Sequence, residues 1–365
     1  MSATKSPNRP RTDKAAHAAK TARADFEIHH QRIAPGKRQQ IEIPVAKTYD
    51  HMDVTMPVEV VHGAHDGPVL FVTAAIHGDE INGVEIIRRL LGSRRINPRQ
   101  LHGTLIAVPI VNVFGFNRQT RYLPDRRDLN RCFPGSATGS LAGQFAHILI
   151  SEIVAKATHG IDLHTGANHR TNLPQIRGCL DDPATAKLAN AFNVPVIINS
   201  SLRDGSLRAV AMDRGIPMLV FEGGQAHRFE DKVIRTGLAG VLAVMETIGM
   251  LTPQAHKPLA EDHDMHVARF TKWVRAPQSG CLRIHKHSGA AVKKGDRLGT
   301  ISDPFGHNKE TVYANISGII IGQSLLPLVN NGDALFHIAG FDDSDAVIDS
   351  IDLYDASLGV DQSPA

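Results

Sequence analysis

The chain has few cysteines, few aromatic residues and no long uninterrupted hydrophobic segment. Cys132, Cys179 and Cys281 are the only cysteines among 365 residues, so a disulfide framework cannot hold the fold together. The longest apolar stretches are either shorter than about 20 residues or interrupted by Asn, Gln, Gly and Pro, which excludes a transmembrane helix. No apolar signal segment follows the basic N-terminus, so the sequence predicts a soluble chain in the reducing cytoplasm.

The marks of a nucleic-acid-binding protein are also missing. Aromatic residues make up 5% of the chain, and no zinc-finger spacing or aromatic-plus-basic pattern occurs. The net charge of +3 comes from the N-terminus, since residues 1–40 hold nine Lys and Arg but three Asp and Glu. Residues 1–25 are therefore predicted to be a disordered basic tail on a slightly acidic protein, with neither nucleic acid nor membrane as a partner.

What the chain does have is apolar material for a large core, with 42% hydrophobic residues and a length that favours two domains. Between about residues 40 and 250, short β-branched runs alternate with helical patterns. The predicted strands are 68–75, 103–110, 160–164, 194–199 and 216–222, and the predicted helices are 82–91, 141–157, 183–191 and 230–250. This alternation predicts an α/β domain over residues 26–264, with a mostly parallel, mixed sheet covered by helices on both faces.

The segment after a Pro- and His-rich linker at 251–264 has a different pattern. Glycines punctuate short alternating strands from residue 265 to 340, which predicts an all-β barrel or sandwich. The run 291–301 is similar to biotinyl and lipoyl domains, but the stretch Asp303-Pro-Phe-Gly306 has no lysine to carry a cofactor. Residues 341–365 are predicted to be an acidic C-terminal tail.

Two histidine motifs stand where predicted strands end. His77-Gly-Asp-Glu80 follows the first buried strand, and His164 ends the strand at 160–164. Because the carboxyl ends of parallel strands meet at one edge, His77, Glu80 and His164 could bind one zinc ion and leave a fourth position open, as in catalytic sites. Asp162 could orient His164. The alternative is that Asp79 and Glu80 only stabilise a helix N-terminus.

A carboxylate and a basic loop complete the candidate site. Glu222 follows four apolar residues and precedes two glycines, a sheltered place in which a glutamate can act as general base and acid. Arg121 and the pair Asn130 and Arg131 lie in a polar loop suited to hold a substrate carboxylate. The alternatives are a solvent-facing acid and an ordinary basic loop.

The motifs H-G-D-E, R-Y, D-L-N-R, D-L-H-T-G and E-G-G occur in an order that resembles the succinylglutamate desuccinylase/aspartoacylase family, relatives of the zinc carboxypeptidases. The resemblance covers roughly residues 40–340. It implies a β domain near the mouth of the active site that restricts entry to small substrates. It also implies that His77, Glu80 and His164 are zinc ligands and that Glu222 is the general base and acid. By the same resemblance, Asn130 and Arg131 bind the substrate carboxylate, and Arg121 polarises the scissile carbonyl.

Other polar residues have less defined roles. For the family's tyrosine from the C-terminal domain, Tyr313 is a candidate and Tyr354 a second. His62 and His65 form an H-x-x-H that is predicted to be a turn, and His285 and His287 are predicted to face solvent. A succinyl substrate needs a second cationic contact, for which the candidates are Arg203, Arg208 and Arg214.

Together these features predict a hydrolase with one zinc ion per chain that cleaves the amide bond of a small anionic N-acylated amino acid. One alternative is a zinc carboxypeptidase that acts on short peptides, although a β domain over the mouth leaves little room for a polypeptide. Another is a non-catalytic zinc-containing binding protein. The sequence does not select the acyl group or the amine, and leaves homo-oligomer formation open.

Overall fold

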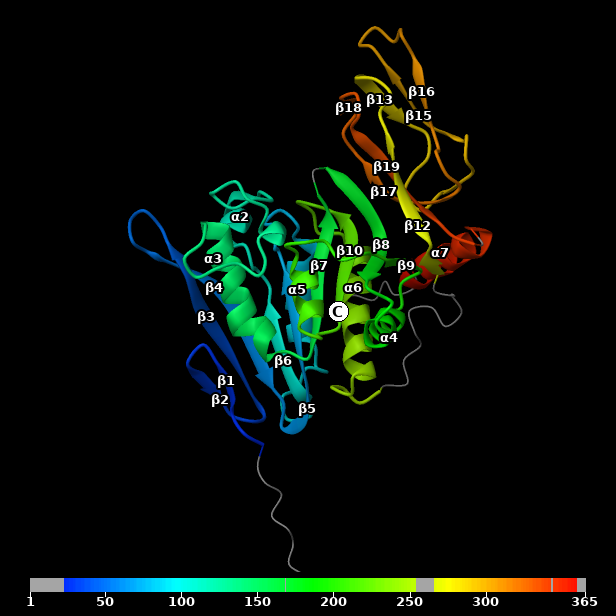
Figure 1. Cartoon of the computed structure of the whole chain (residues 1–365). Coiled ribbons are helices and arrows are strands. Elements are labelled where there is room, and N and C mark those ends of the chain that lie inside the picture. Colours follow the sequence, from blue (N-terminus) through cyan, green and yellow to red (C-terminus); the bar gives the residue numbers. More distant parts are fainter. Residues whose placement is uncertain (1–22, 168, 254–265, 343, 360–365) are drawn as a thin grey trace, which may run out of the picture.

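The computed structural model describes residues 23–167, 169–253, 266–342 and 344–359 (Figure 1). The predicted basic tail, apart from its last residues, and most of the predicted linker lie outside these ranges. Arg23 marks where the described chain begins. Its guanidinium donates to the carbonyl oxygens of Gly63 and Gly103 at 2.5 and 2.9 Å. Arg23 is therefore anchored to the end of the main sheet.

Four parallel strands form the centre of the main sheet: β5 (His65–Ala74), β6 (His102–Val108), β7 (His159–Gly166) and β10 (Met218–Gln225). An antiparallel hairpin of β3 (Lys37–Lys47) and β4 (Asp53–His62) extends the sheet beyond β6. On the other side β8 (Arg170–Gly178) runs antiparallel to β10, and β9 (Val196–Asn199) runs parallel to β8. The predicted mixed sheet is confirmed.

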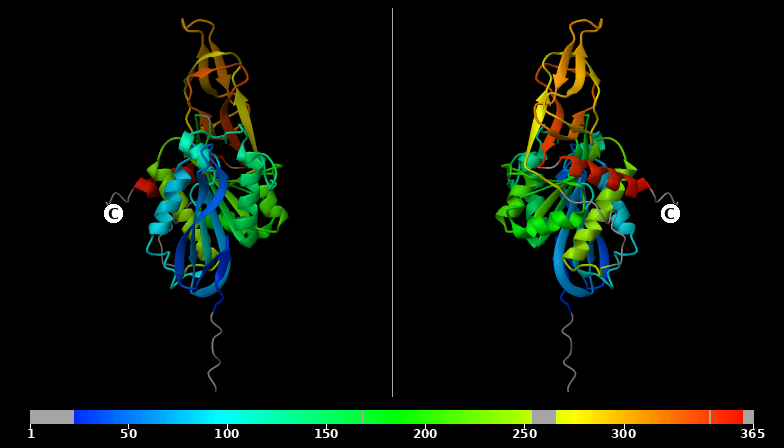
Figure 2. Two further views of the ribbon diagram at one scale, coloured as in Figure 1. Left: turned by 90° about the vertical axis from the view of Figure 1, so that its left-hand side faces the viewer. Right: turned by 90° about the vertical axis from the view of Figure 1, so that its right-hand side faces the viewer.

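Helices cover both faces of this sheet, as the edge-on views of Figure 2 show. On one face α1 (Asn82–Gly92), α4 (Pro183–Phe192) and α6 (Asp231–Thr247) pack over β5, β6, β7 and β10. On the other face lie α3 (Leu141–Ile148), its irregular extension over 149–156, and α5 (Leu207–Asp213). Two short helical segments, α2 (Val113–Arg118) and η1 (Leu129–Arg131), follow β6.

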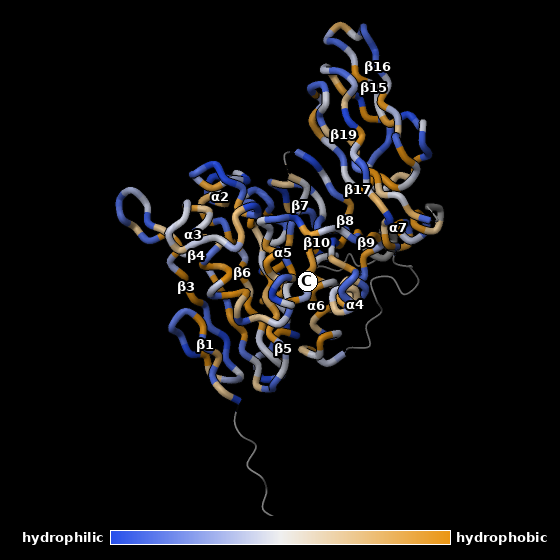
Figure 3. The backbone as a smooth tube through the Cα atoms, in the orientation of Figure 1, coloured by the Kyte–Doolittle hydropathy of each residue, from blue (hydrophilic) through white to orange (hydrophobic). Residues whose placement is uncertain are grey.

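The hydrophobic residues of these elements form two cores, one on each side of the sheet. In Figure 3 the orange segments gather in the interior, and the tip of the β3–β4 hairpin is blue or pale. A small hairpin of β1 (Phe26–Ile28) and β2 (Gln31–Ile33) closes one end through Ile28 and Ile33. None of the described helices combines the length and apolar character needed to cross a membrane.

The C-terminal region consists of short strands, as predicted. A four-stranded sheet contains β13 (Gly280–Ile284), β15 (Arg297–Ser302), β16 (Glu310–Tyr313) and β18 (Leu328–Val329). It packs on β12 (Phe270–Arg275), β14 (Ala291–Val292), β17 (Gly318–Ser324) and β19 (Ala334–Gly340). The short β11 (His266–Ala268) pairs with β9.

Part of this β region belongs to the main sheet. β17 pairs with β8 through Gly322 and Asn172, so β12, β19 and β17 continue the main sheet beyond β8. The segment 341–365, predicted to be a tail, contains a helix, α7 (Ser344–Gly359). Val347 and Ile351 of this helix are buried against β17 and β19, and their burial explains why an Asp-rich segment folds there.

Candidate metal centre and active site

The candidate residues meet at the carboxyl ends of β5, β7 and β10. β5 ends at Ala74, and the loop before α1 carries His77 and Glu80. His164 is on β7 and pairs in register with Glu222 on β10. Parallel pairing therefore brings together residues that are separated by up to 145 positions in the sequence.

His77, Glu80 and His164 form a buried group that could hold a metal ion, since one ligand atom of each lies within 4.8 Å of the others. Nδ1 of His77 lies 2.7 Å from Oε1 of Glu80, and Nδ1 of His164 lies 2.9 Å from Oε2. The two imidazole rings are tilted, with centroids 5.0 Å apart. Both imidazoles therefore direct the same kind of nitrogen toward one carboxylate.

The residues present fit a divalent metal ion. Nδ1 of His77 is buried and has no hydrogen-bond partner in the described part of the chain, although Glu80 Oε1 is close. A buried nitrogen that lacks a well-directed hydrogen bond and faces a carboxylate is suited to bind a metal ion together with that carboxylate. Two imidazole nitrogens and a carboxylate are the donor set of many catalytic sites, with positions left for water and substrate.

In each of the two histidines, the ring nitrogen that does not face Glu80 lies close to another carboxylate. Nε2 of His164 lies 2.6 Å from Oδ2 of Asp162, whose Oδ1 accepts a hydrogen bond from Thr73 at 2.7 Å. Nε2 of His77 lies 3.1 Å from Oδ1 of Asp128. With the proton on Nε2, the Nδ1 lone pair of each ring is free for a metal. Asp162 is thus where the sequence suggested, whereas Asp128 was not predicted although it begins the D-L-N-R motif.

The electrostatics keep the acidic ligand ionised. Burial would raise the pKa of Glu80, but the facing imidazoles of His77 and His164 outweigh burial and hold that pKa well below its usual value. Burial likewise opposes ionisation of Asp128, whose pKa is nevertheless lowered by His77 and Arg121. Glu80 therefore presents a charged carboxylate to the metal position.

The loop after β6 surrounds this centre. Nη1 of Arg121 donates to Glu80 Oε1 at 3.0 Å, and Nη2 donates to Asp128 Oδ2 at 2.8 Å. Asn130 Oδ1 accepts from the backbone N–H of Leu207, the first residue of α5, at 2.9 Å. The loop is therefore tied both to the metal group and to α5.

One cavity of about 210 Å³ brings all seven sequence-predicted site residues together. Arg203, one of the three candidates for a second cationic contact, also lines it, together with Arg170, Asn172, Arg177 and Trp273, which were not predicted. An adjoining cavity of about 370 Å³ shares Glu222 and Arg203 and extends to Arg208. Arg208 is almost buried and donates to the carbonyl oxygens of Ser200 and Ser201, whereas Arg214 is exposed and lines neither cavity.

The C-terminal β region borders the site through its tryptophan. Trp273 on β12 lines the cavity, stacks on His337 with ring centroids 4.5 Å apart, and lies 5.0 Å from the guanidinium carbon of Arg170. Burial and nearby arginines lower the pKa of His337 to about 3. Tyr313, by contrast, is exposed on β16 and lines neither cavity, and the side chain of Tyr354 lies outside the description.

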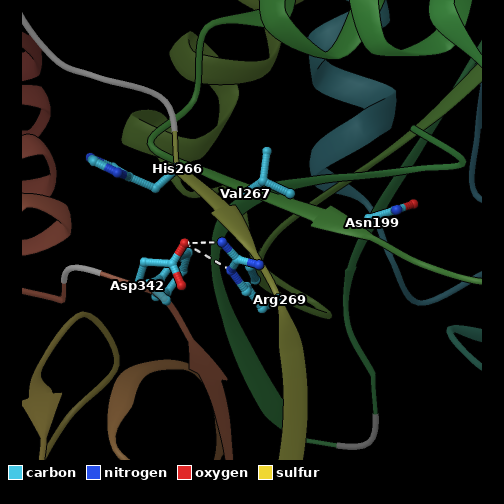
Figure 4. Close-up of a pocket in the computed structure, with 7 residues that line it drawn as sticks. Asn199, His266, Val267, Arg269 and Asp342 are labelled. Atoms are coloured by element: carbon cyan, nitrogen blue, oxygen red, sulfur yellow. Dashed lines mark hydrogen bonds and ion pairs between the residues drawn. The ribbon is translucent and has the colours of Figure 1, made fainter. Parts of the chain in front are cut away.

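The remaining histidines do not form a second metal group among the described residues. His62 is buried, with Nδ1 2.8 Å from Thr104 Oγ1, while His65 is exposed and stacks on His102. His285 and His287 are exposed, as predicted. A larger hollow of about 510 Å³ lies elsewhere, lined by the end of β9, by β11 and by residues 341–342 after β19 (Figure 4). An exposed ion pair of Arg269 and Asp342 borders it, and none of the candidate site residues does.

Gly78 lies between His77 and Glu80, the two candidate metal ligands of the first motif, in a place with no room for a side chain. A Cβ atom at this position would lie 1.9 Å from the backbone carbon of Gly115 in α2. Gly78→Ala is therefore expected to displace the loop, weaken metal binding at least tenfold and lower the melting temperature, because a backbone clash cannot relax cheaply. Calorimetry and metal analysis check this. Gly92→Ala is the control, since nothing lies within 4 Å of a Cβ there, and equal metal content in both variants would contradict the expectation.

Comparison with known proteins places relatives of this chain in one enzyme family. The profile described as succinylglutamate desuccinylase/aspartoacylase catalytic domain matches residues 66–248. A curated relative, the N-alpha-acetyl-L-2,4-diaminobutyric acid deacetylase of Halomonas elongata, is 25% identical over 296 residues, which cover 78% of this chain and 86% of the relative.

Solved structures show the same fold. The succinylglutamate desuccinylase/aspartoacylase from Rhodobacter sphaeroides superposes with a TM-score of 0.74 at 27% identity, covering 83% of this chain and 96% of that one. The product-bound ectoine utilization protein of Ruegeria pomeroyi has a TM-score of 0.74 at 23% identity and covers 83% and 95% of the two chains. The profile match includes the loop of His77 and Glu80, His164 and Glu222, and the chain belongs to the succinylglutamate desuccinylase/aspartoacylase family.

Proposed function

We propose that this protein is a zinc-dependent hydrolase that cleaves the amide bond of a small, anionic N-acylated amino acid. The observation that carries the proposal is the position of Glu222. Its carboxylate lines the same cavity as the buried group of His77, Glu80 and His164. A metal group and a separate carboxylate on one cavity are the parts that hydrolysis of an amide by water requires.

The proposed reaction replaces the C–N bond of the amide with a C–O bond to water. His77, Glu80 and His164 would hold the zinc ion, which when bound would supply Lewis acidity and lower the pKa of water toward neutral. Glu222 takes that proton and returns it to the departing nitrogen, so the products are a carboxylic acid and a free amine. Arg121 stabilises the negative charge that develops on the scissile carbonyl oxygen, and Asn130 and Arg131 bind the substrate carboxylate.

The charge of the cavity favours a substrate with more than one acidic group. Five arginines line it: Arg121, Arg131, Arg170, Arg177 and Arg203. Glu80 and Glu222 are the acidic residues among its lining residues, and both have roles in the proposed reaction. Diaminobutyric acid, named for the Halomonas relative, has a second amine, for which this cavity offers no further carboxylate. The proposed substrate is therefore an N-acylated amino acid with a carboxylate on its side chain or on its acyl group.

Arg203 and Arg214 allow this charge preference to be tested, since both lie between β9 and β10 but only Arg203 lines the cavity. We expect kcat/KM for N-acetyl or N-succinyl dicarboxylic amino acids to exceed that for N-acetyl-diaminobutyrate at least tenfold. Arg203→Ala should reduce this ratio by about tenfold, the effect of one charged hydrogen bond, and Arg214→Ala should leave it unchanged. A preference for diaminobutyrate would contradict the proposed substrate class.

Metal analysis followed by a substrate screen tests the proposed function itself. The purified chain should contain about one zinc ion and release amine from one or more N-acetyl, N-succinyl or N-formyl amino acids. A carboxypeptidase would instead prefer short peptides, which the position of Trp273 at the cavity disfavours. Bound zinc without release of amine from any of these substrates would favour the binding-protein alternative.

A further inference from the structure

Glu222 is held by a residue outside the family motifs. Nδ2 of Asn172 donates a hydrogen bond to Oε2 of Glu222 at 2.8 Å, and both side chains line the cavity. Nε of Arg177 lies 3.8 Å from the other oxygen, Oε1, beyond hydrogen-bond distance. The asparagine therefore fixes one carboxylate oxygen and leaves Oε1 available.

A register shift between β8 and β10 places Asn172 on the correct face. Gln175 pairs with Glu222, so regular antiparallel pairing would put Asn172 opposite Gln225, with its side chain on the face away from Glu222. The shift instead puts Asn172 opposite Gly224, and the amide of Asn172 lies on the face from which it reaches Oε2 of Glu222. Irregularities of this kind redirect side chains and are common beside active sites.

The strand on the other side of Asn172 makes room for it. Gly322 of β17 pairs with Asn172, and a Cβ atom at position 322 would lie 2.8 Å from Asn172 Oδ1. The φ angle of Gly322 is not positive, so space rather than backbone conformation accounts for the glycine. The C-terminal β region thus contributes the empty position against which the amide of Asn172 rests.

We propose that Asn172 is a positioning residue for Glu222, and that Gly322 keeps its amide in place. The Nδ2–H group binds Oε2, so that Oε1 faces the water whose proton Glu222 accepts. Reversing the amide would set Oδ1 against a carboxylate oxygen, which is electrostatically unfavourable, so the donor orientation is fixed. The inference rests on the proposed function, in which Glu222 is the general base.

The first test is Asn172→Ala. We expect kcat to fall about ten- to a hundredfold, because a misplaced catalytic group loses that much rate, with KM within about threefold and zinc content unchanged. Trp273 is the only tryptophan of the chain and lines the cavity, so its fluorescence reports binding of the amine product independently of turnover. That Kd should also change less than about threefold. If the alanine variant does not fold, Asn172→Asp keeps the shape, removes both N–H donors and should be as slow.

The second test asks whether Gly322 on β17 acts through Asn172 on β8. Gly322→Ala should lower kcat as Asn172→Ala does, and the double variant should be no slower than Asn172→Ala alone, since both changes break one hydrogen bond. Thr171→Ala is the control, because Thr171 pairs with the same two strands and lines neither cavity. Additive losses would overturn the role of Gly322, and a kcat within twofold of wild type for Asn172→Ala would overturn the role of Asn172.

Hydrolysis assays on wild type, Glu222→Gln and Asn172→Ala distinguish the general-base role of Glu222 from the positioning role of Asn172. A wild-type protein that hydrolyses nothing, or an active Glu222→Gln variant, contradicts the proposed function. An inactive Glu222→Gln variant together with a fully active Asn172→Ala variant contradicts only the positioning role.

Discussion

Glu222→Gln is expected to abolish amide hydrolysis while zinc remains bound. Glutamine keeps the size of the side chain and can still contact Asn172, but it cannot accept a proton at neutral pH. General acid–base catalysis contributes about a hundred- to ten-thousandfold, so kcat should fall by at least a hundredfold. KM should change little, because Glu222 is not part of the proposed carboxylate clamp. Release of amine over time, measured beside zinc content, checks this expectation.

The matched control is Glu42→Gln, an exposed glutamate on β3 that is far from the cavity in the fold. It should retain wild-type kcat and zinc. A Glu222→Gln variant with zinc bound and kcat within about tenfold of wild type would contradict the general-base role. Loss of zinc from that variant would show instead that Glu222 contributes to the metal centre.

The sequence predicts the part of the site that depends on strand ends. His77, Glu80, His164 and Glu222 each follow a run of apolar residues, and parallel strands bring their carboxyl ends to a common edge. Because a parallel sheet buried on both faces has strongly apolar strands, the positions where apolar runs stop are visible in the sequence. The structure brings these four residues to one cavity.

Residues that depend on pairing register could not be predicted in the same way. Asn172 reaches Glu222 only because the ladder between β8 and β10 shifts by one residue, and a shift of one reverses the face of every side chain beyond it. Trp273 reaches the cavity only because β17 joins β8 after a separation of about 150 residues in the chain. No local pattern in the sequence specifies either pairing.

The other differences between the sequence-based predictions and the structure have similar causes. The acidic segment after residue 340 gave no strong helical pattern, but burial of Val347 and Ile351 stabilises α7 there. Asp128 was visible within D-L-N-R, yet its contact with His77 depends on the path of the loop after β6. Tertiary contacts, rather than local preference, therefore decide the features that the sequence does not show.

Removing the metal is expected to stop hydrolysis and lower the melting temperature. A metal that binds only the folded chain stabilises it by RT ln(1 + [M]/Kd), which is about 4 kcal/mol at a thousandfold excess over Kd. His164→Ala removes a buried ligand and should reduce both zinc content and kcat to near background, whereas zinc added to chelator-treated wild type should restore activity. His65→Ala, at an exposed histidine of the H-x-x-H turn, should retain zinc and activity.

Asp162→Asn is expected to weaken zinc binding without abolishing it. It keeps the shape of the side chain that faces Nε2 of His164 but removes the charge that holds the proton there. Loss of such a partner typically costs ten- to a hundredfold in metal affinity, so this variant should bind zinc more weakly than wild type but more tightly than His164→Ala. Zinc titration in a competing chelator gives the order directly. Equal affinity for Asp162→Asn and wild type would show that His164 is oriented by its other contacts, since only the charge of the partner would have changed.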